Sequence, residues 1–342
     1  MNTAQSRLPL IAITMGDPAG IGPEVLLKAL SEGDLFERCT PLIMGDAGVL
    51  SKVRRELGLS VTLNTVSAPE QAEPNKANLI SLSNINLDTF QFGVSRKDLG
   101  LVSTFYIVKG TEFCVSGKVD ALVTAPINKA MLHEAGYDYT GHTEMLKDYT
   151  HADYASTMLV GDHIRITRVT SHLPISRVAE RITKPRVLKA IRATNLALAD
   201  AFGIANPHVA VCALNPHGGE DSLFGSEEMD VIRPAVEEAR AEGIRVSGPM
   251  PSDIVFPRAR DGQYDAVVCM YHDQALIPFR LIDFGYGVNI TLGLPVIRTS
   301  PDHGTAYDIA GKGIASEKSM IKAIRFAAQM VEKRQRREAN GR

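Results

Sequence analysis

The sequence predicts an α/β fold in which helices cover both faces of a mostly parallel β-sheet. Short runs of apolar and β-branched residues alternate with longer amphipathic runs along most of the 342-residue chain. The strand-like runs, residues 121–126 among them, are predominantly apolar without alternation, as strands buried on both faces are. A chain of this length suggests about two lobes, although no internal repeat or Pro/Ser-rich linker marks a boundary.

The N-terminal part of the chain alternates regularly between strand and helix signals. A strand at 8–16 ends at Gly16-Asp17-Pro18, and the helix that follows carries Pro23 in its first turn, where proline is well tolerated. The next expected elements are a strand at 41–45, a helix at 46–58, an irregular stretch to about residue 98, a helix at 101–117, a strand at 121–126 and a helix at 128–136.

The middle of the chain departs from this alternation. Residues 156–172 form one long β-rich run interrupted at Gly161-Asp162, a pattern typical of a hairpin. A strongly amphipathic helix over 185–203 begins near Pro185 and ends at Gly203. A strand at 208–216, a helix at 229–243, a strand at 265–271, a glycine-rich segment at 287–313 and a closing helix at 316–337 follow.

The composition excludes several classes of protein. Hydrophobic content of 44% and charged content of 22% are ordinary for a globular protein, and the net charge of −2 disfavours a nucleic-acid partner. No apolar run approaches the roughly 18–20 residues that span a bilayer, and no signal-peptide core precedes the first strand. Four widely separated cysteines, expected to be reduced core thiols, are Cys39, Cys114, Cys212 and Cys269. We therefore expect a cytoplasmic protein without nucleic-acid or membrane partners.

Three histidines each follow a strand-like run at the point where it ends. They are His172 in TSHLPI, His217 in NPHGGE and His272 in MYHDQ. Because the carboxyl ends of parallel strands converge on the ligand crevice, three neutral imidazoles there would bind a divalent metal and leave positions open for water or substrate. Taken singly, a histidine after a strand is more often structural, and spacings of 45 and 55 residues form no local metal motif.

The dinucleotide-binding fingerprint of Rossmann folds is missing. The first βα turn reads GDPAGIGPE, which offers Gly16, Gly20 and Gly22 but not G-x-G-x-x-G. The segments GYGVNI and GKGIAS fail at the third glycine, and no Walker loop is present. If the chain uses NAD, another structure must hold it.

Two stretches resemble the isocitrate and isopropylmalate dehydrogenases. GDPAGIGPEV is similar to their D-G-I-G-P-E-V turn, and DHGTAYDIAGKGIA at 302–315 is similar to their H-G-S-A-P-D-I-A-G-K-G-I-A loop. The resemblance implies α/β/α layers, two lobes with a cleft between them, and a loop that wraps the adenosine of NAD. The cofactor-binding residues that it implies are His303, Gly304, Thr305 and Asp308. Read without the resemblance, the same segment is a surface turn followed by a helix start.

Motifs spread from residue 14 to residue 315 resemble the 4-hydroxythreonine-4-phosphate dehydrogenase family of pyridoxal phosphate biosynthesis. They are TMGDPAGIGPE, TAPINKAML, GHTEML, TSHLPI, NPHGGE, YHDQALIP and GVNITLGLPVIRTSPDHGTA. The resemblance implies a homodimer whose metal site draws ligands from both subunits. It makes His172, His217 and His272 the ligands of one divalent metal, zinc, cobalt or magnesium, and makes NAD or NADP the hydride acceptor. The implied lobes are approximately 1–130 with 265–342, and 131–264 for dimerisation and metal ligands.

The resemblance also implies a set of substrate contacts. They are His142, Thr143, Arg280, Asn289 and Arg298, a sensible cradle for a phosphomonoester because guanidinium, imidazole and hydroxyl groups satisfy its oxygens. The family is expected to have lysine where this chain has Arg280, and arginine keeps the charge but does not readily accept a proton. Without the resemblance, Arg280 reads as a helix-surface charge and Asn289 as a strand-edge polar residue.

Two acidic residues match positions that the resemblance implies to maintain the active site. Asp253 in PSDIVF and Asp273 beside His272 could each orient an imidazole or hold a metal-bound water. Their local interpretation is a turn residue and a helix cap.

The expected reaction is oxidation of 4-phosphohydroxy-L-threonine at C3, followed by decarboxylation to 3-amino-2-oxopropyl phosphate. The 4-phosphates of D-threonate and D-erythronate remain alternative substrates, since they differ mainly by a hydroxyl in place of the C2 amino group. A cyclohexadiene diol dicarboxylate is disfavoured as substrate, because the family members that use it resemble this chain less at GHTEM and NITLGLPVIRTS. A non-redox acyl- or phosphotransferase on a related fold would have no use for three histidines or an adenosine loop.

Overall fold

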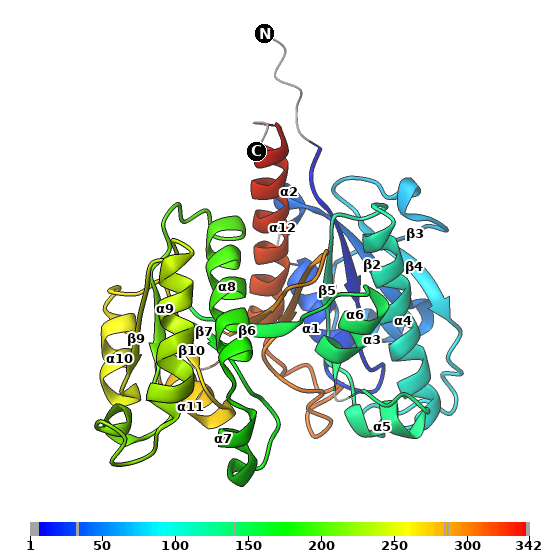
Figure 1. Ribbon diagram of the computed structural model, residues 1–342. Coiled ribbons are helices and arrows are strands. Elements are labelled where there is room, and N and C mark those ends of the chain that lie inside the picture. Colours follow the sequence, from blue (N-terminus) through cyan, green and yellow to red (C-terminus); the bar gives the residue numbers. More distant parts are fainter. Residues whose placement is uncertain (1–6, 32–33, 140, 284, 286, 340–342) are drawn as a thin grey trace. The chain divides into compact units, whose positions relative to one another are not determined.

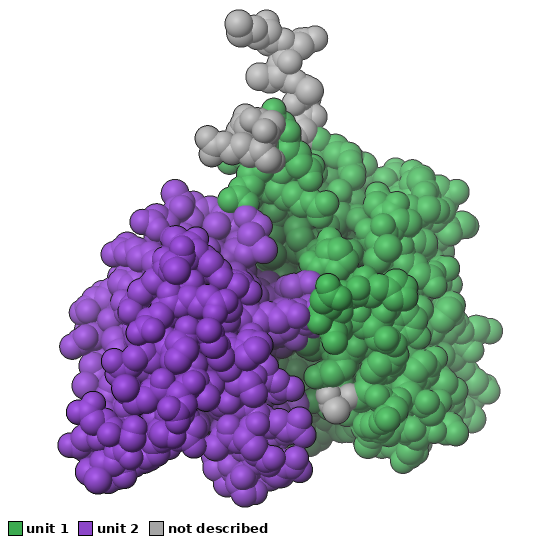
Figure 2. Space-filling view, viewed as in Figure 1, with its two compact units in different colours: residues 1–153, 294–342 green, residues 154–293 purple. Residues whose placement is uncertain are grey.

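The computed structural model describes residues 7–31, 34–139, 141–283, 285 and 287–339. The chain forms two compact units, which Figure 2 colours separately: unit 1 comprises 1–153 and 294–342, and unit 2 comprises 154–293. Each unit contains a sheet with helices packed against it (Figure 1). No described helix combines the length and the apolar character that crossing a membrane requires.

The sheet of unit 1 is parallel, with strand order β3-β4-β2-β1-β5-β12. Its strands are β1 (Leu10–Thr14), β2 (Thr40–Asp46), β3 (Leu63–Thr65), β4 (Ala77–Ser83), β5 (Ala121–Thr124) and β12 (Ile297–Pro301). Its helices are α1 (Gly22–Ser31), α2 (Leu35–Arg38), α3 (Ala47–Glu56), the 3₁₀ turn Pro69–Gln71, α4 (Lys97–Val115), α5 (Lys129–Glu134), α6 (His142–Tyr149) and α12 (Lys318–Ala339).

Both faces of this sheet are covered, which explains why every residue of β1 and β5 is buried and all but the last residue of each strand are apolar. On one face Gly110 of α4 lies so close to Leu122 of β5 that a Cβ there would come within 2.7 Å of the Leu122 side chain. On the other face Thr299 Oγ1 of β12 donates a hydrogen bond of 2.8 Å to Ala323 O of α12. Successive side chains of a strand point to opposite faces, so every position here must be compatible with burial.

The sheet of unit 2 has strand order β11-β6-β7-β10-β8-β9. Its strands are β6 (Ser156–Val160), β7 (Arg165–Arg168), β8 (Val209–Cys212), β9 (Val246–Met250), β10 (Ala266–Cys269) and β11 (Val288–Leu292). Its helices are the 3₁₀ turn Ile175–Arg177, α7 (Val178–Arg181), α8 (Lys184–Asp200), the 3₁₀ turn Pro216–Gly219, the π-helical turn Glu228–Ile232, α9 (Arg233–Ala241), α10 (Ser252–Arg260) and α11 (His272–Asp283). Strand β6 is antiparallel to β7 and β11, and the other pairs are parallel.

Two hydrophobic clusters cover the two faces of this second sheet. Val209 and Val211 of β8 face α8 and α9, whereas Ala210 and Cys212 face α10 and α11. The Sγ atoms of Cys212 and Cys269, on neighbouring strands, lie 3.9 Å apart in the second cluster. Both are free cysteines and buried, which fits the expectation of reduced core thiols.

The predicted hairpin at 156–172 is confirmed as β6 and β7. Its turn is held by the buried Asp283 carboxylate, which accepts hydrogen bonds from the backbone N–H groups of His163 and Ile164, both at 3.1 Å to Oδ2. Gly161 is required in this turn, because a Cβ at that position would lie 2.0 Å from Asp283 Oδ2.

The expectation of an irregular stretch before residue 98 was wrong in part. Strand β4 pairs with β2 and strand β3 pairs with β4 inside that stretch. Only Ala77–Ile80 of β4 is buried, and its last three residues are not, so the local apolar signal is short. Strand β9, which contains Gly248 and Pro249, was likewise not expected.

The division between the units also differs from the approximate lobes expected from the sequence. Residues 265–293 lie in unit 2 rather than in the first unit, and residues 131–153 lie in unit 1 rather than in the second. The first difference arises because β10 is hydrogen-bonded between β7 and β8, so it belongs to the centre of the second sheet.

We predict that Gly16→Ala destabilises the protein by about 3 kcal/mol or more, because two costs add at this position. Gly16 has φ +71°, and a Cβ there would lie 2.3 Å from Pro126 O. Gly117 is a matched control, since its φ is +70° but a Cβ would meet nothing within 4 Å. Gly117→Ala should cost only about 1–2 kcal/mol in urea unfolding. Equal losses in the two variants would contradict the steric part of this prediction.

Candidate active site

The three histidines predicted to bind metal follow three neighbouring parallel strands of unit 2. The strands lie in the order β7, β10, β8, and His172, His272 and His217 follow them respectively, each within five residues of the strand end. They therefore share one edge of the sheet. The rings of His172 and His272 lie side by side, with centroids 5.8 Å apart and planes inclined by 43°.

Buried polar groups fix the strand ends that carry these histidines. Gln274 Oε1 accepts from Met270 N at 2.6 Å, and its Nε2 donates to Ala213 O and Ser252 Oγ, both at 2.7 Å. Thr170 Oγ1 donates to Met270 O at 2.8 Å. One amide side chain thus ties the end of β10 to the end of β8 and the start of α10, and one hydroxyl ties the end of β7 to the same point. Gln274 was not predicted as a site residue, although it stands in the YHDQ motif.

The segment that carries His217 has an unusual backbone. Residues 217–222 all have positive φ values, from 41° at Glu220 to 80° at Gly219. The buried Glu228 carboxylate anchors the start of this segment by accepting from the N–H groups of Leu214 and Asn215, both at 2.7 Å. The His217 side chain itself is exposed and lies 6.1 Å from the Phe224 ring between centroids.

The donor chemistry of this edge fits a divalent transition metal, since imidazoles are good ligands for zinc and cobalt. Asp273 Oδ2 lies 3.4 Å from Nδ1 of His272, an arrangement that would orient the imidazole and leave its Nε2 for a metal. Within one chain, however, the described residues bring no group of three His, Cys, Asp or Glu side chains close enough to hold an ion. The metal assignment of His172, His217 and His272 stays a prediction.

The other predicted residues of unit 2 lie on neighbouring elements. Asp253 is exposed in the first turn of α10, next to Ser252, which Gln274 contacts. Arg280 is half-buried in the last turn of α11, which begins at His272. Asn289 lies in β11, opposite Leu159 of β6.

In unit 1, the structure brings together Arg298, His142 and Lys129. Arg298 of β12 is 3% exposed, and its Nε and Nη2 donate to Thr124 Oγ1 at 3.1 and 2.6 Å. Burial lowers the pKa of Arg298 to about 9, so the guanidinium remains charged at neutral pH. Burial, followed by the charges of Arg298 and Lys129, holds the pKa of His142 well below its usual value.

His142 begins α6, and Thr143 follows it in the first helical turn. Nε2 of His142 is buried and has no hydrogen-bond partner among the residues that the structure describes. Lys129 packs over Gly141, the residue before His142, since a Cβ at Gly141 would lie 3.3 Å from Lys129 Cε. The two cations and the helix N-terminus create a positive potential beside the neutral imidazole, and an anion would relieve it.

Lys129 was not named by the sequence analysis. Its only signal is its place in TAPINKAML, directly after the buried strand β5. Asn128 caps α5, with Oδ1 accepting from the N–H groups of Ala130 and Met131, and this cap positions Lys129 at the first helical residue.

The predicted cofactor loop at 302–315 is anchored to the first βα turn of the same unit. Thr305 O accepts from Ile21 N at 2.9 Å, and Tyr307 Oη donates to Asp17 Oδ2 at 2.6 Å. Asn128 Nδ2 donates to Tyr307 Oη at 2.9 Å. Burial raises the pKa of Asp17, and the hydrogen bonds from Tyr307 and Ala19 oppose that shift. Tyr307 stands where the loop of the resembling dehydrogenases has proline.

The residues expected to contact the cofactor line an open stretch of this loop. Gly304 and Asp308 are exposed, and a Cβ at Gly304 would meet nothing within 4 Å. His303 is half-buried, and its Nδ1 lies 3.1 Å from Gly304 O. Space over the backbone at Gly304 is what a ligand needs for close approach.

Comparisons with known proteins agree on one family. A model of the family described as pyridoxal phosphate biosynthetic protein PdxA matches residues 37–327. The chain is 44% identical over 322 residues to a 4-hydroxythreonine-4-phosphate dehydrogenase of Desulforapulum autotrophicum, covering 94% of this chain and 95% of that relative. It is 43% identical over 330 residues to a D-threonate 4-phosphate dehydrogenase of Cupriavidus necator, covering 96% and 98%.

A solved structure extends this similarity to three dimensions. The crystal structure of a 4-hydroxythreonine-4-phosphate dehydrogenase from Klebsiella pneumoniae has a TM-score of 0.87 to this chain at 37% identity, covering 96% of this chain and 99% of that one. The predicted fold class, an α/β fold of the isocitrate/isopropylmalate dehydrogenase type, is thereby confirmed.

We predict that Tyr307→Phe destabilises the protein by about 1.5–3 kcal/mol at pH 7, because a buried carboxylate loses a donor. Tyr139→Phe is the control, since Tyr139 Oη also donates to an aspartate, Asp148, but at an exposed position. It should cost less than about 0.5 kcal/mol in urea unfolding.

The pH dependence of the Tyr307→Phe loss follows from Asp17. Because burial raises the pKa of Asp17 and the Tyr307 bond opposes this rise, the variant should have a still higher Asp17 pKa. The loss of stability should be full at pH 7 and should shrink as the pH falls through that pKa, since a protonated carboxyl no longer needs the donor. A loss that stays constant from pH 7 to pH 4 would contradict this assignment.

Proposed function

Because the chain belongs to the family of the pyridoxal phosphate biosynthetic protein PdxA, we propose that it is a metal-dependent, NAD(P)-linked dehydrogenase of 4-phosphohydroxy-L-threonine. The C3 hydroxyl is oxidised to a ketone, which gives 2-amino-3-oxo-4-phosphobutanoate. This β-keto acid loses carbon dioxide and leaves 3-amino-2-oxopropyl phosphate, a precursor of the vitamin B6 ring.

The observation that carries this proposal is the positive cluster in unit 1. The charges of Arg298 and Lys129 act on His142, whose Nε2 is buried and lacks a partner among the described residues. The phosphate of the substrate would accept hydrogen bonds from Arg298, Lys129 and the first turn of α6, including Thr143. Arg280 and Asn289 are proposed as further substrate contacts on the strength of the resemblance alone.

The arginine at position 280 affects which residue can accept a proton in the proposed reaction. A guanidinium can bind a substrate anion but is a poor proton acceptor. If Arg280 contacts substrate, it therefore acts through charge and hydrogen bonds. The proton of the C3 hydroxyl must then go to another group, and Asp253 and Asp273 are the proposed candidates.

We propose that His172, His217 and His272 hold the divalent metal. When bound, the metal would lower the pKa of the C3 hydroxyl, and NAD(P) would accept the hydride. Asp273 would keep the His272 ring in the orientation that exposes Nε2. Gln274 and Thr170 would hold the strand ends at fixed spacing, so that the imidazoles are aligned before the metal arrives.

The proposed homodimer has support in the surface of unit 2. Large apolar side chains are exposed in the segments that follow the three histidines in sequence: Leu173 and Ile175 after His172, Leu223 and Phe224 after His217, and Ile277 and Leu281 after His272. Ile175 and Leu223 are each 72% exposed and Leu281 is 81% exposed. Such a group of apolar residues favours an interface, and a partner subunit seated there would explain why one chain does not assemble the three ligands.

A second candidate substrate is D-threonate 4-phosphate. It is favoured by the relative from Cupriavidus necator, whose identity to this chain is nearly the same as that of the biosynthetic relative. The two substrates differ at C2, where one has a hydroxyl and the other an amino group. Both are phosphomonoesters, so the same positive cluster would serve either.

We expect the purified protein, supplied with a divalent metal, to reduce NAD or NADP with 4-phosphohydroxy-L-threonine as substrate. The measurement is the initial rate of dinucleotide reduction, compared with rates on D-threonate and D-erythronate 4-phosphates. A strong preference for a sugar-acid phosphate would move the enzyme from biosynthesis to catabolism. No turnover of any of the three would overturn the dehydrogenase proposal.

We predict that His172→Ala, His217→Ala and His272→Ala each lower kcat/KM on the order of a hundredfold or more, because a metal ligand is lost. Each variant should also bind less than one metal per chain by elemental analysis. His208→Ala is the control, since His208 lies in the same unit but bonds Ser247 Oγ through Nε2. Wild-type metal content in any of the three variants would remove that residue from the metal site.

A further inference from the structure

The loop at 302–317 has no regular structure to set its shape. These residues, all of them described, contain no helix or strand between β12 and α12. Long irregular segments depend on side-chain anchors for a defined conformation. The first anchor is at Thr305 and Tyr307, which contact the βα turn at Ile21 and Asp17. The second anchor is at the far end of the loop.

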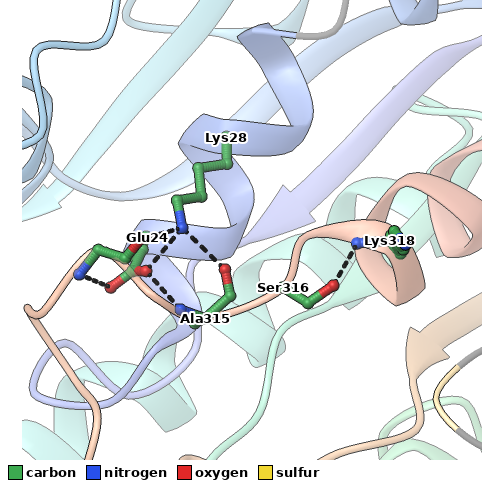
Figure 3. Close-up of polar contacts among 6 residues, drawn as sticks. Glu24, Lys28, Ala315, Ser316 and Lys318 are labelled. Carbon is green, nitrogen blue, oxygen red and sulfur yellow. Dashed lines mark hydrogen bonds and ion pairs between the residues drawn. The ribbon is translucent and has the colours of Figure 1, made fainter.

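The second anchor is the ion pair of Glu24 and Lys28, one turn apart on α1 (Figure 3). Glu24 Oε1 accepts from Ala315 N at 2.9 Å, and Oε2 accepts from Gly313 N at 3.2 Å. Lys28 Nζ donates to Gly313 O at 2.6 Å and to Ala315 O at 2.8 Å, and also to Glu24 Oε1 at 2.9 Å. The pair therefore engages both the N–H and the C=O of two loop residues.

The glutamate of the pair is buried and the lysine is half-buried, which makes the position of the pair informative. Glu24 is 1% exposed, and its carboxylate is fully occupied by Lys28 and the loop. Replacing a buried ion pair with apolar side chains of similar size is often neutral or stabilising. A pair at this place, directed at backbone rather than at side chains, is better explained by the conformation that it imposes than by stability.

The residues that would meet a ligand adjoin the first anchor or lie between the two. Gly304 is exposed just before the first anchor, and Asp308 and Lys312 are exposed between the anchors, whereas Ala310 is buried. Gly313, with φ +74°, has the left-handed conformation that lets the chain present two backbone groups to Glu24 and Lys28. A loop held at both ends and open in the middle is pre-organised for a ligand, which lowers the entropy lost on binding.

We propose that Glu24 and Lys28 are positioning residues for the dinucleotide, which fix the 302–315 loop in its binding conformation before NAD(P) arrives. This inference rests on the proposed function, because it takes that loop as the dinucleotide site. It assigns the pair no contact with the cofactor or the substrate. Its effect should therefore fall on dinucleotide affinity and not on the chemical step.

The test uses the double variant Glu24→Gln/Lys28→Met, which keeps side-chain size and removes both charges. Lys52→Met/Glu56→Gln is the matched control, since that pair also spans one turn of a helix in unit 1, α3, but is partly exposed. We expect the dissociation constants of NAD and NADP, measured by titration calorimetry, to rise about tenfold or more in the first variant only. The rate at saturating dinucleotide and the KM for the phosphorylated substrate should stay near wild type.

Hydrogen–deuterium exchange provides a second readout that does not need activity. Peptides covering 303–315 should exchange faster in the Glu24→Gln/Lys28→Met variant, while peptides of β1 and β5 should not change. If that variant does not fold, the single Glu24→Gln variant serves, because it leaves no unpaired buried carboxylate and keeps the Lys28 bonds to Gly313 O and Ala315 O.

The outcomes separate the two proposals. A folded variant with unchanged dinucleotide affinity and unchanged exchange at 303–315 would overturn the positioning role. An equal loss of kcat and of both substrate affinities would also overturn it, since that pattern indicates general damage. Wild-type protein that binds neither NAD nor NADP would overturn the dehydrogenase proposal, and this inference with it.

Discussion

The parallel pairing of β7, β10 and β8 is the constraint on which the histidine-bearing edge of unit 2 depends. Neighbouring parallel strands end on the same edge of a sheet, so His172, His272 and His217 reach one region without any local motif. Hydrogen bonds from Gln274 and Thr170 then fix the strand ends relative to one another. The imidazoles themselves remain exposed or half-exposed, and their positions follow from the main chain that carries them.

Unit 1 differs in that the Arg298 side chain and Nε2 of His142 are buried, although Lys129 is exposed. Arg298 and Lys129 both disfavour protonation of His142, and Nε2 of that imidazole is withheld from water without a partner among the described residues. Burying polar groups in this way lowers the free energy of unfolding, that is, the stability of the fold. Local rules of stability are most often broken where a ligand will satisfy the groups concerned, and a phosphate would satisfy these.

The sequence predicted an element correctly where residues within that element mark its start or its turn. Pro23 marks the first turn of α1, and Gly161-Asp162 marks the hairpin turn. Strand β3 has three residues, and only the first half of β4 is buried, so their existence depends on pairing with β2, which the sequence does not display. Composition and periodicity also gave no reason to group residues 265–293 with the second unit.

The site residues also differ in whether the local sequence alone could predict them. The three histidines were found from their places after strands, whereas His142 and Arg298 were named only through a family resemblance. Lys129 was not named, because its motif TAPINKAML does not show that its side chain lies against Gly141, next to His142, in the fold. Glu24 and Lys28 read as an ordinary pair on one helix. Only the fold shows that their other partners stand 285 to 291 residues further along the chain.

Unit 1 is built from both ends of the chain, with unit 2 between them in sequence. One edge of β5 pairs with β1, and the other edge pairs with β12, for example Ala121 with Ile297. During synthesis, all of unit 2 therefore leaves the ribosome while one edge of β5 is still open. An open strand edge is a template for wrong pairing, and long-range strand pairing is slow to form. The most vulnerable period in the life of this protein is consequently set by the time needed to translate residues 154–293, and it ends when β12 and α12 close the sheet.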